Sequence, residues 1–417
     1  MSSAKDPENA GKISYSEYKR LRDVWIRWTF LRCQPPLSTR YHWFWKWWGR
    51  YDWSMIMGLR GVNLGNWLVL EKWMGASPLS SAKSEDDRGL IDEFEPEVLA
   101  AALEEHRSTF ITEDDFAWME REGIDLVRIP VPYYLFGTAH HTACVEHLDN
   151  ALAWAERHHI RVLIDLHTVP YSQNGFDNGG YMGLCAWAQD QARIDETVDT
   201  LEAIALRYQG NPALWGIEPL NEPASAFILE MNLKNYGANH PDRVARSKVI
   251  ERSTLLAFYD EVYHRLRPIV GPDVKLVFHD QFELESWDHL LPCDHYENIA
   301  IDTHMYLVFS EWGFRKYDVP EYVRMVKKFA ARIKSAARYH EILVGEWCLG
   351  NHSPLIKSLD EDGKRSFYRS LADAQFDAFD QSLGSCYWSL RVDDGKHRDW
   401  DLRTCVREGW LDLRYGR

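Results

Sequence analysis

Two glutamates, each following a short apolar run, carry the chemistry that this sequence suggests. Glu222 lies in Leu220-Asn221-Glu222-Pro223, and Glu346 follows the run Ile342-Leu343-Val344-Gly345. Two carboxylates that face one cleft are the minimal equipment for cleaving a glycosidic bond, one as acid and one as nucleophile. In a barrel of parallel strands, catalytic side chains are mounted where the strands end. A single glutamate at such a position is more often a solvated loop residue, so the interpretation depends on what accompanies the pair.

Eight short apolar segments bounded by turn residues predict buried parallel strands. They are Met57–Leu64, Asp125–Val131, Arg161–His167, Leu214–Leu220, Lys275–His279, Ile299–Thr303, Ile342–Gly345 and Ser385–Ser389. Amphipathic segments between them predict helices over Thr112–Glu122, Val145–His159, Ile194–Tyr208, Ser247–Arg267, Tyr322–Arg338 and Asp362–Phe379, with a weaker one at Leu284–Leu291. Alternation of this kind implies right-handed crossovers. Eight repeats without a Gly-x-Gly-x-x-Gly loop favour an α/β fold of the closed (β/α)8 type, a TIM barrel, over an open sheet. We expect the barrel to occupy residues 57–417.

The composition excludes some classes of partner. The net charge of −15 argues against nucleic acid, whose phosphates need a basic surface. No apolar stretch is long enough to span a bilayer, so no membrane is expected. The first residues lack the pattern of a secretory signal, and the seven cysteines are scattered without a Cys-x-x-Cys pair. We therefore expect reduced thiols, a cytoplasmic location and no zinc cluster.

The segment of residues 1–56 differs from the rest of the chain. Seven tryptophans lie between Trp25 and Trp53, and ten Lys/Arg stand against five Asp/Glu in an otherwise acidic protein. Such an aromatic patch is expected to be covered, because exposed apolar patches mark interfaces. Three roles stay open for this Trp-rich extension: a cap on the barrel, a subunit interface that builds a homo-oligomer, or a lid over the sugar site.

The remaining motifs carry a family resemblance. They are Arg60-Gly61-Val62-Asn63-Leu64-Gly65-Asn66-Trp67-Leu68-Val69-Leu70-Glu71, Val127-Arg128-Ile129-Pro130, Asp165-Leu166-His167, Ser172-Gln173-Asn174-Gly175-Phe176-Asp177-Asn178, Leu220-Asn221-Glu222-Pro223, Asp302-Thr303-His304-Met305-Tyr306, Gly345-Glu346-Trp347 and Tyr387-Trp388. In this order, the chain resembles glycoside hydrolase family 5, and within it the exo-β-1,3-glucanase branch most of all.

The resemblance implies a role for each side chain of the catalytic centre. Glu222 would be the acid/base and Glu346 the nucleophile, which requires environments that push their pKa values apart. Arg128 can fork onto Glu346 and keep it ionised, and Tyr306 can donate its hydroxyl to the same carboxylate. Asn221 is suited to the sugar 2-hydroxyl, whose hydrogen bond tightens in the transition state.

Other matching residues would surround the sugar. His167 is expected on a sugar hydroxyl, His304 near the acid, and Trp388 as a flat platform under the ring. Residues matching Glu71 and Asp177 hold the non-reducing-end sugar in the exo-glucanases and close the cleft behind it. The match further implies that Phe176 and Phe309 flank the next sugar.

The sequence also departs from the exo-glucanase pattern. Asn66 stands where those enzymes usually carry Gly, and Met305 where they usually carry His. Residues 168–171 replace a small glycine-containing turn, and residues 391–395 lack the usual pattern. Catalysis is expected to survive these changes, whereas the choice between a glucosyl and a mannosyl unit stays open.

The sequence therefore predicts a retaining, exo-acting β-glycosidase acting on a small oligosaccharide, a β-mannoside or β-glucoside, without metal or cofactor. Two kinds of alternative stay open. One is an exo-β-1,3-glucanase, transglycosylase or endo-glucanase acting on β-glucans. The other is a barrel that binds sugar without cleaving it.

Overall fold

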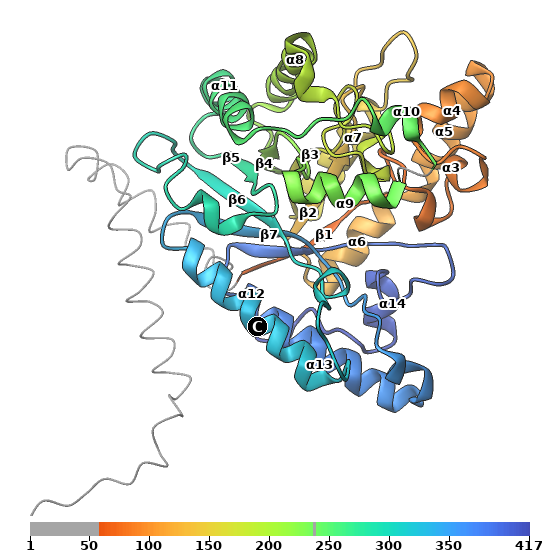
Figure 1. Ribbon diagram of the computed structural model, residues 1–417, viewed down its shortest axis with the longest axis vertical. Helices are drawn as coiled ribbons and strands as arrows, with labels where there is room; N and C mark the ends of the chain where they lie inside the picture. Colours follow the sequence, from red (N-terminus) through yellow and green to blue (C-terminus); the bar gives the residue numbers. More distant parts are fainter. Residues whose placement is uncertain (1–57, 237–238) are drawn as a thin grey trace, which may run out of the picture. The chain divides into compact units, whose positions relative to one another are not determined.

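The fold is a closed barrel of eight parallel strands, β1 to β8 in chain order, as predicted (Figure 1). The computed structural model describes residues 58–236 and 239–417. The strands are β1 Leu59–Asn63, β2 Leu126–Val131, β3 Arg161–Leu166, β4 Leu214–Glu218, β5 Lys275–His279, β6 Ile299–His304, β7 Glu341–Trp347 and β8 Gly384–Tyr387. The last strand pairs with the first, Leu59 opposite Gly384, which closes the barrel.

The barrel interior changes character along the strands. Side chains alternate between the two faces of a strand, so positions two residues apart share the interior. A lower interior layer is apolar and consists of Leu59, Leu126, Leu163, Val277, Ala300, Leu343 and Cys386. Two residues further along four of these strands stand Arg128, Asp165, His279 and Asp302, all buried. The same alternation that packs the barrel bottom therefore places a buried charged layer directly beneath the carboxyl ends of the strands.

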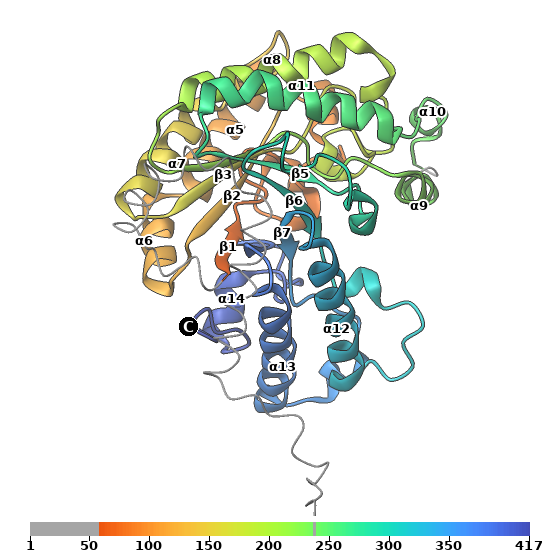
Figure 2. The same cartoon turned by 90° about the vertical axis from the view of Figure 1, so that its left-hand side faces the viewer.

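Helices surround the barrel, and two pairs of neighbours, α8 with α11 and α12 with α13, run side by side in both ribbon views (Figures 1 and 2). The longer helices are α5 Pro96–Phe110, α6 Glu113–Glu122, α7 Val145–Arg157, α8 Gln191–Tyr208, α9 Ala226–Tyr236, α11 Arg252–Val270, α12 Val319–Ala336 and α13 Glu361–Phe379. The shorter helices are α3 Pro78–Ser81, α4 Asp87–Glu93, α10 Pro241–Val244 and α14 Leu402–Arg407. Helix α6 has the predicted ends: Thr112 forms a capping box, and Gly123 takes the left-handed conformation.

Three helix predictions need correction. In place of the helix predicted over Leu284–Leu291, the chain forms only the short 3-10 helix Leu284–Trp287. The helix expected from Ser247 begins at Arg252 instead. The interval between β1 and β2 holds an insertion with α3, α4 and α5, which was not predicted, because its short helices are separated by Ser, Pro and acidic residues rather than by a clear apolar period.

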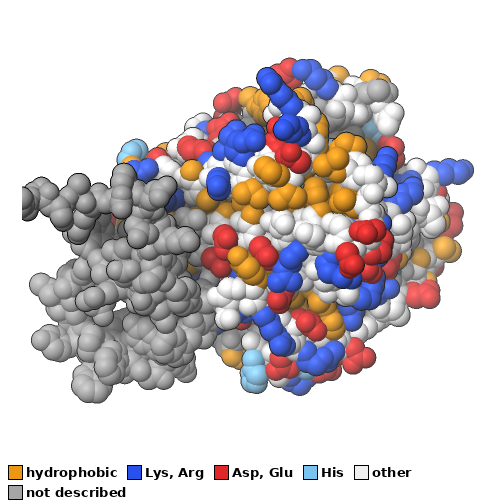
Figure 3. Space-filling view, turned by 90° about the horizontal axis from the view of Figure 1, so that it is seen from below, with side chains coloured by type: hydrophobic (Ala, Val, Ile, Leu, Met, Phe, Trp, Pro, Cys, Tyr) orange, Lys and Arg blue, Asp and Glu red, His pale blue; other side chains and the backbone are white. Residues whose placement is uncertain are grey.

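Several sequence predictions concern features outside the barrel. The Trp-rich extension lies outside the described residues, so its role and the oligomer it could build stay predictions. Among the described helices, none combines the length and hydropathy needed to cross a bilayer. On the face shown in Figure 3, Lys and Arg are intermixed with Asp and Glu around a band of hydrophobic side chains.

Cys144, Cys185, Cys348, Cys386 and Cys405 are free and buried. The expectation of reduced thiols is wrong for Cys293, which is disulfide-bonded.

Candidate active site

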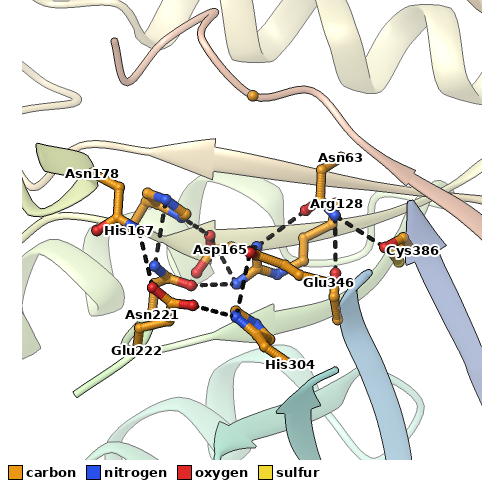
Figure 4. Close-up of polar contacts among 12 residues, drawn as sticks. Asn63, Arg128, Asp165, His167, Asn178, Asn221, Glu222, His304, Glu346 and Cys386 are labelled. Carbon is orange, nitrogen blue, oxygen red and sulfur yellow. Dashed lines mark hydrogen bonds and ion pairs between the residues drawn. The ribbon is translucent and has the colours of Figure 1, made fainter. Parts of the chain in front are cut away.

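Glu222 and Glu346 come together at the carboxyl end of the barrel (Figure 4). Glu222 follows β4 and Glu346 lies within β7; both are almost fully buried. His304, at the end of β6, contacts both: its Nδ1 lies 2.6 Å from Glu222 Oε1 and 3.3 Å from Glu346 Oε2. These two oxygens therefore cannot be farther apart than the sum of the two distances, 5.9 Å.

The backbone around each glutamate is specialised. Glu222 has a φ of 46°, in the left-handed region that non-glycine residues seldom adopt and that is typical of functional positions. Gly345, next to Glu346, donates its N–H to Asp302 Oδ1 at 2.6 Å. A Cβ at this glycine would lie 2.0 Å from the Asp302 carboxylate. Glycine is therefore required here, because the Asp302 carboxylate occupies the space that any larger residue would need.

Arg128, on β2, holds the nucleophile candidate in place. Its Nη1 donates to Glu346 Oε1 at 2.9 Å, a single hydrogen bond where a fork was predicted, and to Asn63 Oδ1 at 3.0 Å. Its Nε and Nη2 fork onto Glu218 at 2.8 and 3.2 Å. The guanidinium is completely buried, and an Arg fork of this kind fixes orientation as well as charge. The Glu346 carboxylate is therefore oriented by a guanidinium group that is itself held by hydrogen bonds to Glu218 and Asn63.

Tyr306 and Asn221 complete this framework. The Tyr306 hydroxyl donates to Glu346 Oε2 at 2.7 Å, as predicted from the sequence. Asn221 Oδ1 accepts from Arg128 Nη2 at 2.8 Å. The side chain of Asn221 is therefore oriented from one side by Arg128, and its amide nitrogen lies 3.3 Å from His167 Nε2. Each oxygen of the Glu346 carboxylate therefore accepts one hydrogen bond, Oε1 from Arg128 and Oε2 from Tyr306.

His167 and Trp388 form one wall of the site. His167 Nδ1 lies 2.6 Å from Asp165 Oδ2, which fixes the ring. The ring stacks on Trp388, with centroids 5.6 Å apart and planes within 14°. Gly65 lies under the same indole, and a Cβ there would be 2.8 Å from it. A flat aromatic surface therefore lines the site where the sequence places the sugar platform.

The protonation pattern differs from the predicted one. Burial opposes ionisation of Glu222, but the hydrogen bond and charge of His304 outweigh it and lower the Glu222 pKa. Burial raises the pKa of Glu346, and the charges of His304 and Arg128 offset this only in part. Burial lowers the His304 pKa, yet the charges of Glu346 and Asp302 prevail and hold it well above its usual value. An acid at Glu222 and a nucleophile at Glu346 require the opposite order of pKa values, and His304, 2.6 Å from Glu222, is the group whose protonated form this environment favours.

Glu71 and Asp177 lie close enough to the glutamate pair to share its electrostatics. The pKa of Glu71 is raised well above its usual value by burial first and then by the charges of Asp177, Glu346 and Glu222. Burial likewise raises the pKa of Asp177, with Glu222 adding to it. The four carboxyl groups therefore interact electrostatically, and each makes ionisation of the others less favourable.

Asn66, one of the departures from the exo-glucanase pattern, positions Glu71. Its φ is 58°, a conformation that Gly adopts freely and Asn tolerates, which explains why the two residues exchange here. Its Oδ1 accepts from the Glu71 N–H at 3.0 Å, and its Nδ2 donates to Gly75 O at 2.6 Å. Trp73 Nε1 donates to Glu71 Oε2 at 2.7 Å. The departure therefore preserves the backbone and adds a side chain that anchors the loop.

The predicted aromatic pair is less closely associated. Phe309 is 66 % exposed and meets Tyr306 edge-on at 5.5 Å. Phe176 is partly buried against the core, and no ring contact joins it to Phe309 among the described residues. Phe309 therefore has a free face, as a residue flanking a second sugar requires.

Sequence reasoning missed three further members of the site. Asn178 Nδ2 donates to Glu222 Oε2 at 3.0 Å. Glu218 receives the Arg128 fork, and Trp400 stacks on Tyr306 with centroids 5.2 Å apart. Glu218 carried a usable signal, a carboxylate at the end of β4 like the two catalytic candidates. Trp400 carried none, because it lies in the loop after β8, far along the chain from Tyr306.

Two triads of ligand-type side chains could hold a metal ion, because their ligand atoms lie within 4.8 Å of one another. They are Glu222 with His279 and His304, and Glu218 with Asp302 and His304. Both depend on His304, which already bridges the two glutamates. The absence of a metal requirement stays a prediction that chelation can test.

Comparisons with known proteins agree with this geometry. The family model for cellulase (glycosyl hydrolase family 5) matches residues 92–394. The probable glucan 1,3-beta-glucosidase A of Emericella nidulans is 31% identical over 392 residues, covering 84% of this chain and 89% of that protein. The glucan 1,3-beta-glucosidase of Schwanniomyces occidentalis is 28% identical over 84% of this chain and 86% of its own.

Solved structures share the fold. The rutinosidase from Aspergillus niger superposes with a TM-score of 0.68 at 20% identity, covering 86% of this chain and 99% of that one. The endoglucanase Cel5A from Thermotoga maritima gives a TM-score of 0.53 at 15% identity, with coverage of 86% and 98%.

Proposed function

The chain belongs to glycosyl hydrolase family 5, and we propose that it is a retaining, exo-acting β-glucosidase that releases the terminal glucose of short β-linked glucosides. Membership confirms the resemblance drawn from the sequence motifs, and the chain is a glycoside hydrolase. The observation that carries the proposal is the pair of buried glutamates bridged by one imidazole nitrogen. Their nearest oxygens lie below the roughly 6.5 Å at which inverting enzymes begin, which supports retention.

In the first step, Glu346 attacks the anomeric carbon while Glu222 protonates the departing oxygen. The Glu346 carboxylate is held by Arg128 and Tyr306, so one oxygen is aimed without losing its charge. A nucleophile fixed in this way reacts without the entropy loss of an encounter between free groups. Asn221, itself oriented by Arg128, stands where a sugar 2-hydroxyl can receive its N–H.

The acid obtains its proton through His304. In the free site the imidazolium lies 2.6 Å from an ionised Glu222, so a shift along this hydrogen bond yields neutral imidazole and a protonated acid. A substrate that excludes water and buries the pair favours this neutral form over two separate charges. Glu222 then passes the proton to the glycosidic oxygen and becomes a carboxylate.

In the second step, Glu222 removes a proton from water, which attacks the glycosyl-enzyme and frees Glu346. The glycosyl bond has removed the charge of Glu346, so the electrostatic support for a proton on His304 is weaker at this stage. The histidine can then accept the proton back once Glu346 is ionised again. Each cycle therefore ends with the starting distribution of charge.

Exo action rests on the carboxyl groups of Glu71 and Asp177. Glu71 is buried and Asp177 half-buried, and both interact electrostatically with the catalytic pair. Carboxylates that accept hydrogen bonds from the hydroxyl groups of one terminal ring would close the site behind that ring. The stack of Trp400 on Tyr306, with Phe309 beside it, supports a second sugar on the leaving-group side.

The proposal favours a glucoside because the curated relatives are named glucan 1,3-beta-glucosidases. A β-mannoside stays a prediction that no relative named above supports. Hydrolysis of 4-nitrophenyl β-glucoside and β-mannoside by the purified protein separates the two. Preference for the glucoside, with glucose and a tetrasaccharide as the first products from a β-1,3-linked pentasaccharide, is the expected result. Disaccharide and trisaccharide as the first products would mean endo action, and faster mannoside cleavage would refute the sugar assignment.

Two alternatives have distinct outcomes in the same assay. A transglycosylase would yield products longer than the substrate at high acceptor concentration. A barrel that only binds sugar would release no 4-nitrophenol. The cytoplasmic location and a homo-oligomer built through the Trp-rich extension also stay predictions, for which fractionation of the native cells and light scattering of the purified chain are the measurements.

A further inference from the structure

A cavity separate from the catalytic carboxylates lies between the insertion helices and the loop after β2. Its volume is about 220 Å³. The lining residues are Asp87, Leu90, Ile91, Phe94, Pro96, Leu99, Leu103, Arg107, Tyr134 and the segment 138–142. None of them contacts Glu222 or Glu346 among the interactions of the described chain. The cavity has the volume of roughly seven water molecules at about 30 Å³ each, enough for a small organic ligand.

Helical spacing turns two faces toward this cavity. Leu99, Leu103 and Arg107 are successive fourth residues of α5 and therefore share one side of that helix. Leu90 and Ile91 line the cavity from α4, and Phe94 lines it from the extended residue that follows the helix. The insertion has its own small apolar core, made of Leu70, Leu79, Ala82, Leu90 and Leu99, apart from the main core of the barrel. The cavity lies at the seam between this small core and the barrel, where the two packing units meet.

Arg107 is a buried cation that forms no direct ion pair in the described chain, although its charge lowers the pKa of Asp87 in the same cavity. Its side chain is almost fully buried, and the Nε atom has no hydrogen-bond partner. One Nη1 contact, to Ala143 O at 3.5 Å, is the limit of hydrogen-bond distance. Within residues 58–236 and 239–417, no carboxylate lies within 4.0 Å of this guanidinium. Buried guanidinium groups are normally paired, so this one is prepared for a partner that the chain does not supply.

The rest of the cavity restricts what that partner can be. The walls from α4 and α5 are mainly aliphatic, which suits an apolar body. The Asp87 carboxyl accepts from the Tyr134 hydroxyl at 2.6 Å, and burial raises its pKa to about 6. The charge of Asp87 offsets part of the charge of Arg107, so the cavity disfavours a doubly charged anion. His141 stacks on Tyr134 with centroids 4.0 Å apart and closes the polar side.

We propose that this cavity is a second ligand site, which binds a small monocarboxylate with a short apolar chain through the guanidinium of Arg107. The carboxylate accepts the fork of Arg107, and the chain lies against Leu90, Leu99 and Leu103.

Isothermal titration of the full-length protein with hexanoate at neutral pH tests this proposal. Its roughly eight non-hydrogen atoms fit the volume stated above. Hexan-1-ol, which has the same chain without the charge, should bind at least tenfold more weakly. Arg107→Met keeps the aliphatic stem and removes the fork, so it should weaken hexanoate binding by roughly ten- to hundredfold. Arg88→Met is the matched control, because Arg88 lies on α4, is exposed and pairs with Asp92 outside the cavity.

A second variant leaves Arg107 in place. Ile91→Trp fills the cavity from α4 and should remove hexanoate binding while hydrolysis of the aryl glucoside stays at the wild-type rate, which also reports correct folding. Equal affinity of wild type and Arg107→Met for hexanoate would overturn the proposal. Equal affinity for hexanoate and hexan-1-ol would overturn it too, as would hexanoate binding that survives Ile91→Trp. Acetate at the same ionic strength controls for general salt effects.

Discussion

Replacing Tyr306 by Phe removes the hydroxyl group that donates a hydrogen bond to the proposed nucleophile, Glu346, and keeps the aromatic ring. The hydroxyl donates to Glu346 Oε2 at 2.7 Å, and the ring is retained against Trp400. Glu346 keeps its second hydrogen bond, from Arg128 at 2.9 Å. The substitution therefore tests how much the aim and charge of the nucleophile depend on a single neutral donor.

The magnitude follows from the kind of bond that is lost. A hydrogen bond to a charged group contributes about 1.5–3 kcal/mol, and each 1.36 kcal/mol is about tenfold in rate. Tyr306→Phe should therefore lower kcat roughly 10- to 150-fold if the bond is kept or strengthened in the transition state. Because the hydroxyl favours the ionised form of Glu346, its removal also raises the Glu346 pKa, and the acid limb of the pH–rate profile moves to higher pH.

The assay is steady-state hydrolysis of an aryl β-glucoside across pH, with Tyr322→Phe as a matched control. Tyr322 also donates its hydroxyl to a buried glutamate, Glu311 Oε1 at 2.6 Å, but outside the catalytic cluster. Both variants should lose stability to a similar degree, whereas only Tyr306→Phe should lose rate. An unchanged kcat and acid limb for Tyr306→Phe would refute the assignment of this contact to the nucleophile, and equal loss in both variants would reduce it to a folding effect.

Four more predictions follow from the same site. Glu346→Gln should abolish turnover and, at neutral pH, increase the free energy of unfolding by about 0.5–2 kcal/mol. The reason is that a carboxyl group whose pKa is higher in the folded than in the unfolded state destabilises the fold once the pH exceeds its unfolded pKa. A lower melting temperature in scanning calorimetry would contradict this. Asp302→Asn removes a charge that raises the His304 pKa, so the alkaline limb of kcat/KM should move to lower pH; an unmoved limb in the pH profile would mean that His304 does not carry the essential proton. Glu71→Gln should lower kcat/KM for terminal glucosides by up to about tenfold, because the amide replaces only part of the hydrogen bonding that the carboxyl group offers the sugar, and unchanged kinetics would remove Glu71 from the sugar site. Dialysis against EDTA should leave the rate unchanged, and a loss restored by a divalent cation would assign a metal to the His304 triads.

The sequence was sufficient for the barrel because its signal is local and repeated. Apolar strands such as Arg161–Leu166 and capped helices such as Glu113–Glu122 are determined by neighbours along the chain. The motifs and their order also predicted that Arg128 and Tyr306 contact Glu346. These contacts follow from topology, because the carboxyl ends of parallel strands must meet at one end of the barrel.

The protonation pattern and the cavity could not be predicted in the same way. The high pKa of His304 depends on its contacts with residues from β4, β6 and β7, which are distances and not motifs. The cavity at Arg107 depends on α4 and α5, two insertion helices that the apolar pattern did not reveal. Trp400 is missed for the same reason, since its partner Tyr306 is remote in sequence. Electrostatic interactions and packing between segments that are distant in the chain cannot be predicted from local sequence patterns.

Covalent trapping tests the central claim most directly. The purified protein is incubated with a 2-deoxy-2-fluoro-β-glucosyl fluoride, digested, and analysed by mass spectrometry for the labelled peptide. Because the 2-fluoro group slows both steps while the reactive fluoride leaving group speeds only the first, the glycosyl-enzyme should accumulate, with the sugar on Glu346. A label on Glu222 or Glu71, or steady hydrolysis that releases the α-anomer without any labelled peptide, would contradict the two-glutamate retaining mechanism.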